Sequence, residues 1–165
     1  MPATRSRSSC GDGSPASRSW EAPSSCATTW RISFERWKRA GTISRYFYDS
    51  WAILEYLNKG RLAAYFRSGR GVTTWLQLME VFYALLRDGK SESEARDVIA
   101  ALQPHVIDFS FDDVLGAVGI RTQMVRKQRN LSYVDAIGYY VARKRRLQFL
   151  TGDPGFRGLP GVLVP

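Results

Sequence analysis

The stretch LSYVDAIGYYVA at residues 131–142, followed by FLTGD at residues 149–153, decides the fold of this chain. The first part predicts a helix with Ser132 as its N-cap, because a serine oxygen at that position accepts a free backbone N–H. Apolar residues then recur at spacings of three and four and form one packed face, namely Val134, Ile137, Gly138 and Val141. The second part predicts a short strand at 148–151 that ends before Gly152 and the turn residues that follow.

Two acidic residues stand at the ends of these elements. Asp135 lies in the first turn of the helix, where the helix dipole favours an anion, and Asp153 follows the strand. In an open α/β sheet, both places can lie at the carboxyl ends of strands, where such folds build their sites. The alternative is that Asp135 supports the helix start and Asp153 starts a turn, and these two residues alone favour neither interpretation.

The composition is that of one ordinary domain with a hydrophobic core. The chain has 165 residues, of which 44% are hydrophobic. No apolar run reaches the ~18 residues of a membrane span, and Arg5 and Arg7 are not followed by the apolar core of a secretory signal. We therefore expect a cytoplasmic protein that does not associate with membranes.

Residues that bind zinc or form disulfides are scarce. The chain has two cysteines, Cys10 and Cys26, and one histidine, His105, which are too few for a structural zinc site. A disulfide would be unusual in a reducing cytosol. His105 is predicted to be a strand-edge residue rather than a catalyst. The chain also lacks a glycine-rich phosphate loop, which argues against a nucleotide-binding dehydrogenase or ATPase.

The net charge of +9 is spread over two unlike regions. Residues 1–45 hold eight basic and three acidic residues, a net charge of +5, and have the turn chemistry of a linker. We expect them to be a largely disordered extension, either an arm that binds nucleic acid or sequence upstream of the true start. Residues 46–165 hold sixteen basic and twelve acidic residues, a net charge of +4, and are predicted to form the domain. A basic balance suits a polyanionic partner, although charge alone is more simply explained by a soluble surface.

Strands and helices alternate along residues 46–165. Strands are predicted at 45–49, 72–73, 106–109, 148–151 and 162–164, and helices at 51–58, 61–66, 75–86, 91–103, 111–128 and 132–142. Ser50 is expected to cap the first helix, and Ser91 and Ser110 open capping boxes with Glu94 and Asp113. This alternation is typical of a parallel sheet sandwiched by helices.

Four acids stand out by position. Asp49 ends the first strand, Glu80 lies inside the apolar helix 75–86, and Asp135 and Asp153 stand as described above. Gln77 and Glu80 are the only polar residues inside that helix and share one face. An ionised acid is rarely buried without a partner, which favours a functional role for Glu80 over simple emergence at the surface. In contrast, Asp112 and Asp113 are interpreted as helix-start acids.

A convergence of these four acids would define the chemistry. The carboxylates would repel one another at a cost that protons or cations relieve. Oxygen ligands without histidine favour Mg²⁺ or Mn²⁺, which polarise a phosphodiester. A basic rim then suits an anionic backbone, and its candidates are Arg126, Lys127 and Arg129 before the central helix and Arg143, Lys144, Arg145 and Arg146 at its end. Helix capping and solubility explain the second cluster equally well.

Four blocks follow one another along residues 46–165: FYDS-x-x-ILEYL at 47–57, Thr73-Thr74 with the helix through Glu80, LSYVDA at 131–136, and FLTGDPGF at 149–156. With these blocks, residues 46–165 resemble the PIN domain, the nuclease fold of VapC toxins. Each block is weak alone, whereas the four together at these spacings are fairly specific. In one departure, many members have a further acid where this chain has Gly155, so a second metal ion is expected to be weak or absent.

The resemblance implies a three-layer α/β/α sandwich around a central parallel sheet of four or five strands. It also implies an endoribonuclease that depends on Mg²⁺ or Mn²⁺ and is the toxin of a toxin–antitoxin pair, with RNA as substrate. The four acids carry over as catalytic and metal-binding residues, namely Asp49, Glu80, Asp135 and Asp153. Ser50 and Thr151 are supporting candidates that orient water or brace a carboxylate, although a cap and a strand end explain them as well.

The resemblance further implies a homodimer and a cognate antitoxin. Trp51 and Tyr65 are candidates for the protein surfaces involved. Two alternatives remain: a non-catalytic PIN-like module that binds RNA or a protein, favoured by Gly155 and the basic N-terminus, and a nuclease of RNA processing.

Overall fold

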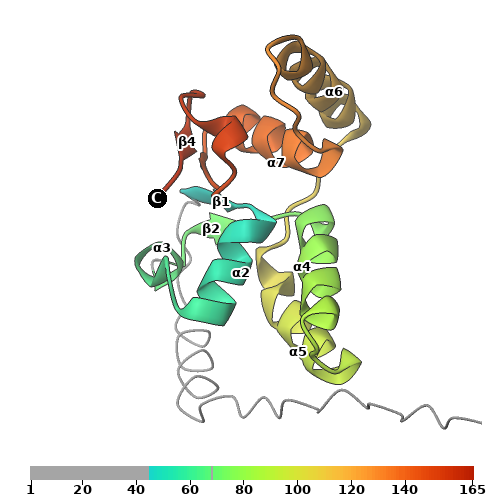
Figure 1. Cartoon of the computed structure of the whole chain (residues 1–165), viewed down its shortest axis with the longest axis vertical. Coiled ribbons are helices and arrows are strands. Elements are labelled where there is room, and N and C mark those ends of the chain that lie inside the picture. The colour runs from blue at the N-terminus through green and yellow to red at the C-terminus, as the bar shows by residue number, and fades with distance from the viewer. Residues whose placement is uncertain (1–44, 68) are drawn as a thin grey trace, which may run out of the picture.

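A parallel sheet of four short strands organises the described part of the chain (Figure 1). The computed structural model describes residues 45–67 and 69–165, so the predicted extension, except for Arg45, lies outside the described residues. The strands are β1 (Tyr46–Tyr48), β2 (Gly71–Val72), β3 (Gln148–Leu150) and β4 (Val162–Leu163). Their spatial order is β2–β1–β3–β4, and every pairing is parallel. The predicted fold class, an α/β sandwich with a central parallel sheet, is confirmed.

Helices cover both faces of this sheet. In Figure 1, one layer lies below the strands and comprises α2 (Ser50–Lys59), α3 (Ala63–Arg67), α4 (Trp75–Arg87) and α5 (Glu92–Leu102). The other layer lies above them and comprises α6 (Phe111–Arg126) and α7 (Tyr133–Lys144). None of these helices has the length and apolar character that crossing a bilayer requires.

The two layers exist because successive residues of a strand point to opposite faces. Phe47 and Phe149 are fully buried against α6 and α7, with their ring centroids 5.7 Å apart. Tyr48 and Leu150, the next residue of each strand, are buried with the helices of the other layer. Each short strand therefore contributes to two hydrophobic cores.

Helix α7 forms as the sequence predicts and lies close to the sheet. Ser132 and Asp135 make a capping box, in which each side chain accepts the backbone N–H of the other residue. Gly138 allows the close approach, because a Cβ atom there would lie 3.0 Å from the Phe47 ring and 2.6 Å from Nε2 of Gln77. The capping boxes predicted at Ser91 and Ser110 are also present.

Three local predictions differ from the structure. Residues 106–109 form a single bridge between Val106 and Thr73 instead of a strand, because Thr74 already caps α4 and the neighbouring strand ends there. His105 closes a 3₁₀ turn (Gln103–His105), and its carbonyl accepts the Thr73 N–H at the sheet edge. The cap of α2 is Asp49 rather than Ser50, since the Asp49 carboxylate accepts the Ser50 N–H.

We predict that Gly138→Ala destabilises the protein by about 1–3 kcal/mol, because the added methyl overpacks a filled interface. The matched control is Gly119→Ala in α6, where a Cβ atom would meet nothing within 4 Å. This control should be about 0.5–1 kcal/mol more stable than wild type, because alanine favours the helix. Urea unfolding measures both variants, and equal effects would contradict the packing described here.

Candidate metal centre

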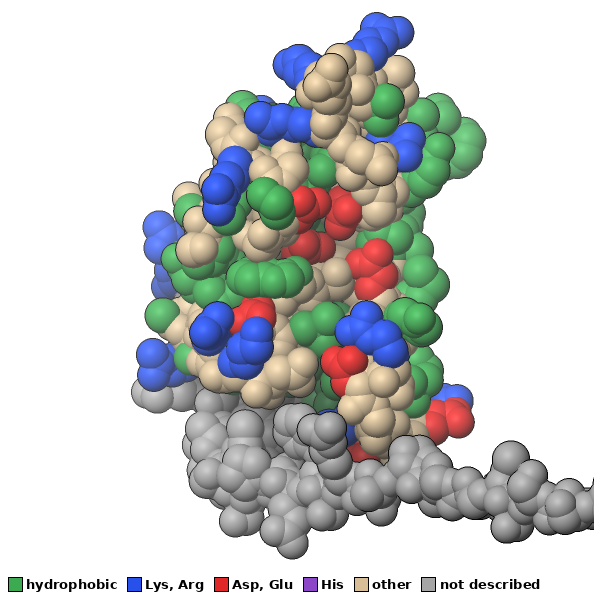
Figure 2. Space-filling view, in the orientation of Figure 1, with side chains coloured by type: hydrophobic (Ala, Val, Ile, Leu, Met, Phe, Trp, Pro, Cys, Tyr) green, Lys and Arg blue, Asp and Glu red, His purple; other side chains and the backbone are tan. Residues whose placement is uncertain are grey.

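Three of the four predicted acids meet at one place. Asp49, Glu80 and Asp135 each offer a carboxylate oxygen, and these oxygens all lie within 4.8 Å of one another. Asp49 follows β1, Glu80 lies in α4, and Asp135 lies in the first turn of α7. Figure 2 shows acidic side chains gathered near the middle of the face toward the viewer. The carboxyl end of a parallel strand and two helices thus converge, as α/β sites commonly do.

Asp49 is the most buried of the three carboxylates, with an exposed fraction of 2%. Its Oδ2 accepts a hydrogen bond from the Thr151 hydroxyl at 2.6 Å, and its Oδ1 accepts the Ser50 N–H at 2.8 Å. Burial is the main reason why the pKa of Asp49 is raised to about 7. The negative charges of Asp135 and Glu80 also raise this pKa, whereas the hydrogen bonds from Thr151 and Ser50 oppose the shift. The site therefore favours the binding of a proton or a cation.

Glu80 is half-buried and is held by the start of α2. The Ser50 hydroxyl donates to Oε2 of Glu80 at 2.7 Å. Burial raises the pKa of Glu80, the Ser50 bond opposes this, and the charge of Asp135 raises the pKa further. Ser50 thus contacts two carboxylates, one through its backbone N–H and one through its hydroxyl.

Gln77 links α4, which carries Glu80, to α7, which carries Asp135. It is fully buried, and its Nε2 donates to the Val134 carbonyl in the first turn of α7 at 3.0 Å. Its Oε1 accepts the hydroxyl of Thr74, the N-cap of α4. Because Glu80 lies one turn after Gln77 and Asp135 follows Val134, this link sets the spacing of the two acids. The sequence signal for it was the shared face of Gln77 and Glu80.

Asp153 lies outside the group of three. Its Oδ1 accepts the Gly155 N–H at 2.7 Å and caps the 3₁₀ turn Pro154–Phe156. Its backbone N–H donates to the Thr151 hydroxyl at 3.1 Å, the same hydroxyl that donates to Asp49. Gly155 is tightly enclosed, because a Cβ atom there would lie 3.0 Å from a Leu131 methyl and 3.1 Å from Oδ1 of Asp153.

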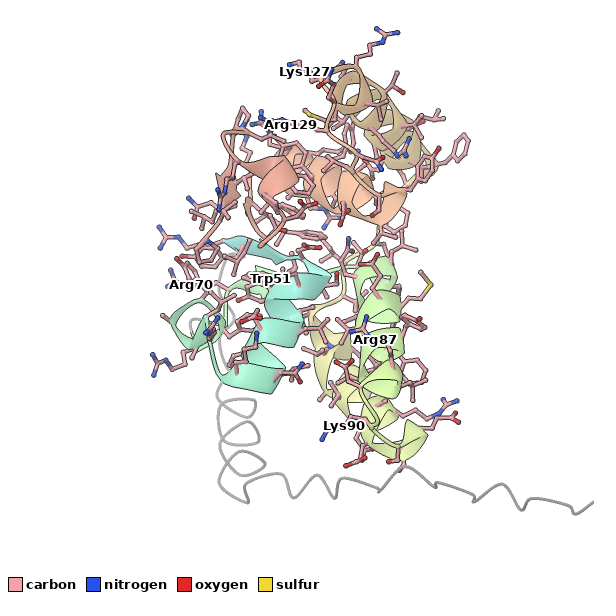
Figure 3. All side chains as sticks on the ribbon, in the orientation of Figure 1. Trp51, Arg70, Arg87, Lys90, Lys127 and Arg129 are labelled. Carbon is pink, nitrogen blue, oxygen red and sulfur yellow. The ribbon has the colours of Figure 1, made fainter. Side chains whose placement is uncertain are left out.

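The predicted basic residues before α7 have different surroundings. Arg129 donates to the carbonyls of Gly155 and Arg157, both at 3.0 Å, and so holds the turn that follows Asp153. Arg126 ends α6 and Lys127 is its C-cap, and both are exposed. Figure 3 shows Lys127 at the far end of this layer and Arg129 closer to the body of the domain.

The basic residues at the end of α7 lie away from the acids. Arg143 and Lys144 come eight and nine residues after Asp135, which places them about 12 Å along the helix axis. Lys144 pairs with the buried Asp113 of α6 at 2.6 Å, and this bond holds the pKa of Asp113 below its usual range. The geometry at this helix end fits the interpretation as capping and helix–helix contact.

The three carboxylates fit a hard divalent cation. All the donors are oxygens, the donor type that Mg²⁺ and Mn²⁺ prefer in proteins. Their mutual repulsion is what a cation relieves, and the raised pKa of Asp49 records that repulsion together with burial. Asp49, Glu80 and Asp135 are therefore close enough together to bind a metal ion.

Comparison with known proteins supports the fold. Neither a model of a protein family nor the sequence of a curated protein matches the chain. Among solved structures, a chain of a toxin–antitoxin complex from Klebsiella pneumoniae is similar, with a TM-score of 0.53 and 23% sequence identity. The similarity covers 71% of this chain and 94% of that one. At this identity it shows the fold alone.

The pKa of Asp49 predicts a pH-dependent stability. Its folded pKa of about 7 lies above the ordinary value of 3.8, so between these values the folded protein holds a proton that the unfolded chain releases. The stabilising effect of this group is complete below the lower value and is lost as the pH rises through the higher one. In EDTA, we expect the Tm to fall by several degrees between about pH 5.5 and 8.5.

Thermal melts of Asp49→Asn provide the comparison, because asparagine keeps the N-cap of α2 but does not titrate. This variant should show a much flatter dependence of Tm on pH. Added MnCl₂ should raise the wild-type Tm more at the higher pH, because metal ligands must be deprotonated. A dependence on pH that is the same in both proteins would contradict this account of Asp49.

Proposed function

We propose that this protein is a metal-dependent endoribonuclease and the toxin of a toxin–antitoxin pair. The observation that carries the proposal is the group of three carboxylates, of which one is buried and all are fixed by hydrogen bonds from Ser50, Thr151 and Ser132. A cluster of this kind is costly to fold unless a cation occupies it. Keeping it fits catalysis better than it fits simple binding.

In this proposal, Asp49, Glu80 and Asp135 hold one Mg²⁺ or Mn²⁺ ion. The ion supplies Lewis-acid polarisation of a phosphodiester and neutralises charge that develops at phosphorus. The protein keeps the ligands in place: Thr151 and Ser50 orient Asp49, and Ser50 also orients Glu80. Asp153 supports the same place through the Thr151 hydroxyl, to which its backbone N–H donates.

The toxin role is supported by the similarity to a chain of the toxin–antitoxin complex from Klebsiella pneumoniae. That protein is found with its partner, and we propose that this chain likewise assembles with an antitoxin and with a second copy of itself. The described helices leave apolar side chains exposed at helical spacing, namely Met79, Tyr83 and Leu86 on α4 and Phe111, Leu115, Val118 and Val125 on α6. Figure 2 shows apolar side chains along the edge formed by these helices.

The two residues that the sequence suggested for such surfaces differ in exposure. Tyr65 is partly buried, packs edge-on against Tyr46, and its carbonyl accepts the Tyr48 hydroxyl. Trp51 is partly exposed and packs on Gly152. The outer faces of α4 and α6 are thus better candidates for protein contacts than Tyr65.

Sedimentation equilibrium tests the proposed homodimer. At micromolar concentration, we expect the mass of two chains, because apolar side chains that gather on one exposed helix face commonly mark a protein interface. A single-chain mass over the same concentration range would contradict the dimer without bearing on catalysis.

The nuclease proposal predicts that Asp135→Asn lowers RNA cleavage on the order of 10²–10³-fold, because the metal site loses one negative charge. Asparagine keeps the shape of the side chain, and the loss of repulsion should leave the fold as stable as wild type or more stable. Cleavage of RNA by wild type should require Mg²⁺ or Mn²⁺ and stop with EDTA. A gel assay of labelled RNA measures both effects.

Glu94→Gln is the matched control for Asp135→Asn. Glu94 holds the same capping-box position in α5, where its carboxylate accepts the Ser91 N–H at 2.9 Å, but it lies outside the group of three. It should cleave like wild type. An Asp135→Asn variant as active as wild type, or cleavage that persists in EDTA, would contradict the proposal. No cleavage of any RNA by wild type would favour the binding module.

A further inference from the structure

The large aromatic side chain of Trp51 lies beside the cluster of three carboxylates, Asp49, Glu80 and Asp135. Trp51 lies in the first turn of α2, and its exposed fraction is 36%. Its indole ring packs on the backbone of Gly152, where a Cβ atom would lie 2.2 Å from Cε2 of the ring. The glycine therefore creates the place in which the indole lies, and the ring is held against a strand end instead of projecting freely.

Both chain segments that hold this indole also hold the acids. Trp51 directly follows Ser50, which donates to Asp49 and Glu80. Gly152 directly follows Thr151, which donates to Asp49. The indole thus spans the ends of β1 and β3 at the edge where the carboxylates meet. Figure 3 shows Trp51 at the start of α2, and the same face in Figure 2 carries the acidic side chains.

The other exposed aromatic side chain near an acid in the sequence points elsewhere. Tyr133 precedes Asp135 by two residues, which is about 200° of rotation around a helix. Its ring lies under the guanidinium of Arg121, 4.3 Å from ring centroid to Cζ, on the side of α6. Of the two exposed aromatic side chains within two residues of Asp49 or Asp135, Trp51 and Tyr133, it is therefore Trp51 that lies at the edge where the carboxylates meet.

We propose that Trp51 is a stacking platform for an unpaired nucleobase of the RNA. A phosphate of the same RNA would lie at the cluster of Asp49, Glu80 and Asp135. This inference rests on the proposed nuclease function and names its substrate class, a single-stranded segment or loop. A fixed and partly exposed indole offers a flat apolar surface on which any base can stack. Bases within a duplex are already stacked on their neighbours, so the platform selects for splayed, single-stranded RNA.

Binding measured in EDTA tests this inference separately from cleavage. The probe is a fluorescent single-stranded RNA of mixed sequence, compared with the same strand annealed to its complement. Trp51→Leu should weaken binding of the single strand roughly 5- to 100-fold, the range typical for loss of one base–aromatic stack. Trp51→Phe should restore most of this affinity, because phenylalanine retains an aromatic face. Duplex binding should change little in either variant.

The matched control is Trp75→Leu. Trp75 is also an exposed tryptophan in the first turn of a helix, with an exposed fraction of 47%, but it belongs to α4, whereas the atoms nearest to a Cβ at Gly152 are those of Trp51. Single-strand binding by this variant should equal that of wild type. Thermal melts of all variants show whether the Leu substitution has altered the fold, and Trp51→Phe then carries the comparison.

Fluorescence and kinetics give two further readouts that a merely structural role would not move. Single-stranded RNA should quench wild-type tryptophan emission, and the quenching should be lost in Trp51→Phe. In cleavage assays, Trp51→Leu should raise KM with little change in kcat, since the stack is present before and during reaction.

Two results would overturn the inference: a Trp51→Leu variant that binds single-stranded RNA like wild type, or equal losses for Leu and Phe. Absence of wild-type cleavage would instead contradict the proposed nuclease function, while the binding comparison in EDTA still decides the role of Trp51.

Discussion

The structure depends on placing a buried carboxylate at the end of the central strand without leaving it unsatisfied. Asp49 follows β1 and is 2% exposed, and an ionised group so enclosed is stable only with hydrogen bonds and compensating charge. The Thr151 hydroxyl and the Ser50 N–H supply the hydrogen bonds. Burial and the negative charges of Asp135 and Glu80 raise the pKa of Asp49 to about 7 in spite of these hydrogen bonds.

The sheet and the helices around it together position the groups that surround the buried Asp49 carboxylate. β1 and β3 pair in parallel register, with Tyr48 opposite Leu150, so that Asp49 and Thr151 follow side by side. Gln77 then joins α4 to α7 and sets the spacing of Glu80 and Asp135. Gly138 lets α7 lie near enough to β1 and β3 for this link to form. Residues far apart in sequence are thereby held to one small volume by buried polar contacts, which are costly to break singly.

Much of this arrangement could be predicted from the sequence because it depends on residues that are close together in the sequence. The capping boxes, the apolar face of α7 and the acids at element ends are all short-range signals, and they indicated the parallel α/β fold. They also predicted that four acids converge, of which Asp49, Glu80 and Asp135 lie together and Asp153 lies outside the group. What failed depended on tertiary neighbours. The segment 106–109 has strand-like composition, but the segment it pairs with through Thr73 continues into α4 after Thr74, so that only a single bridge forms. Likewise, Ser50 has the chemistry of an N-cap, but Asp49 one residue earlier takes that role and frees the Ser50 hydroxyl for Glu80.

The difference between Asp153 and the other three acids also has a local cause. A carboxylate that follows a strand and precedes Pro-Gly can accept a backbone N–H of the turn, and Asp153 does so with Gly155. A side chain at position 155 would crowd both that carboxylate and Leu131. The turn therefore uses Asp153 as a cap, and a side chain at position 155 would require Leu131 and Asp153 to shift by a few tenths of an ångström. Together, these features leave Asp49, Glu80 and Asp135 as the acids whose carboxylate oxygens lie close enough together to bind a metal ion.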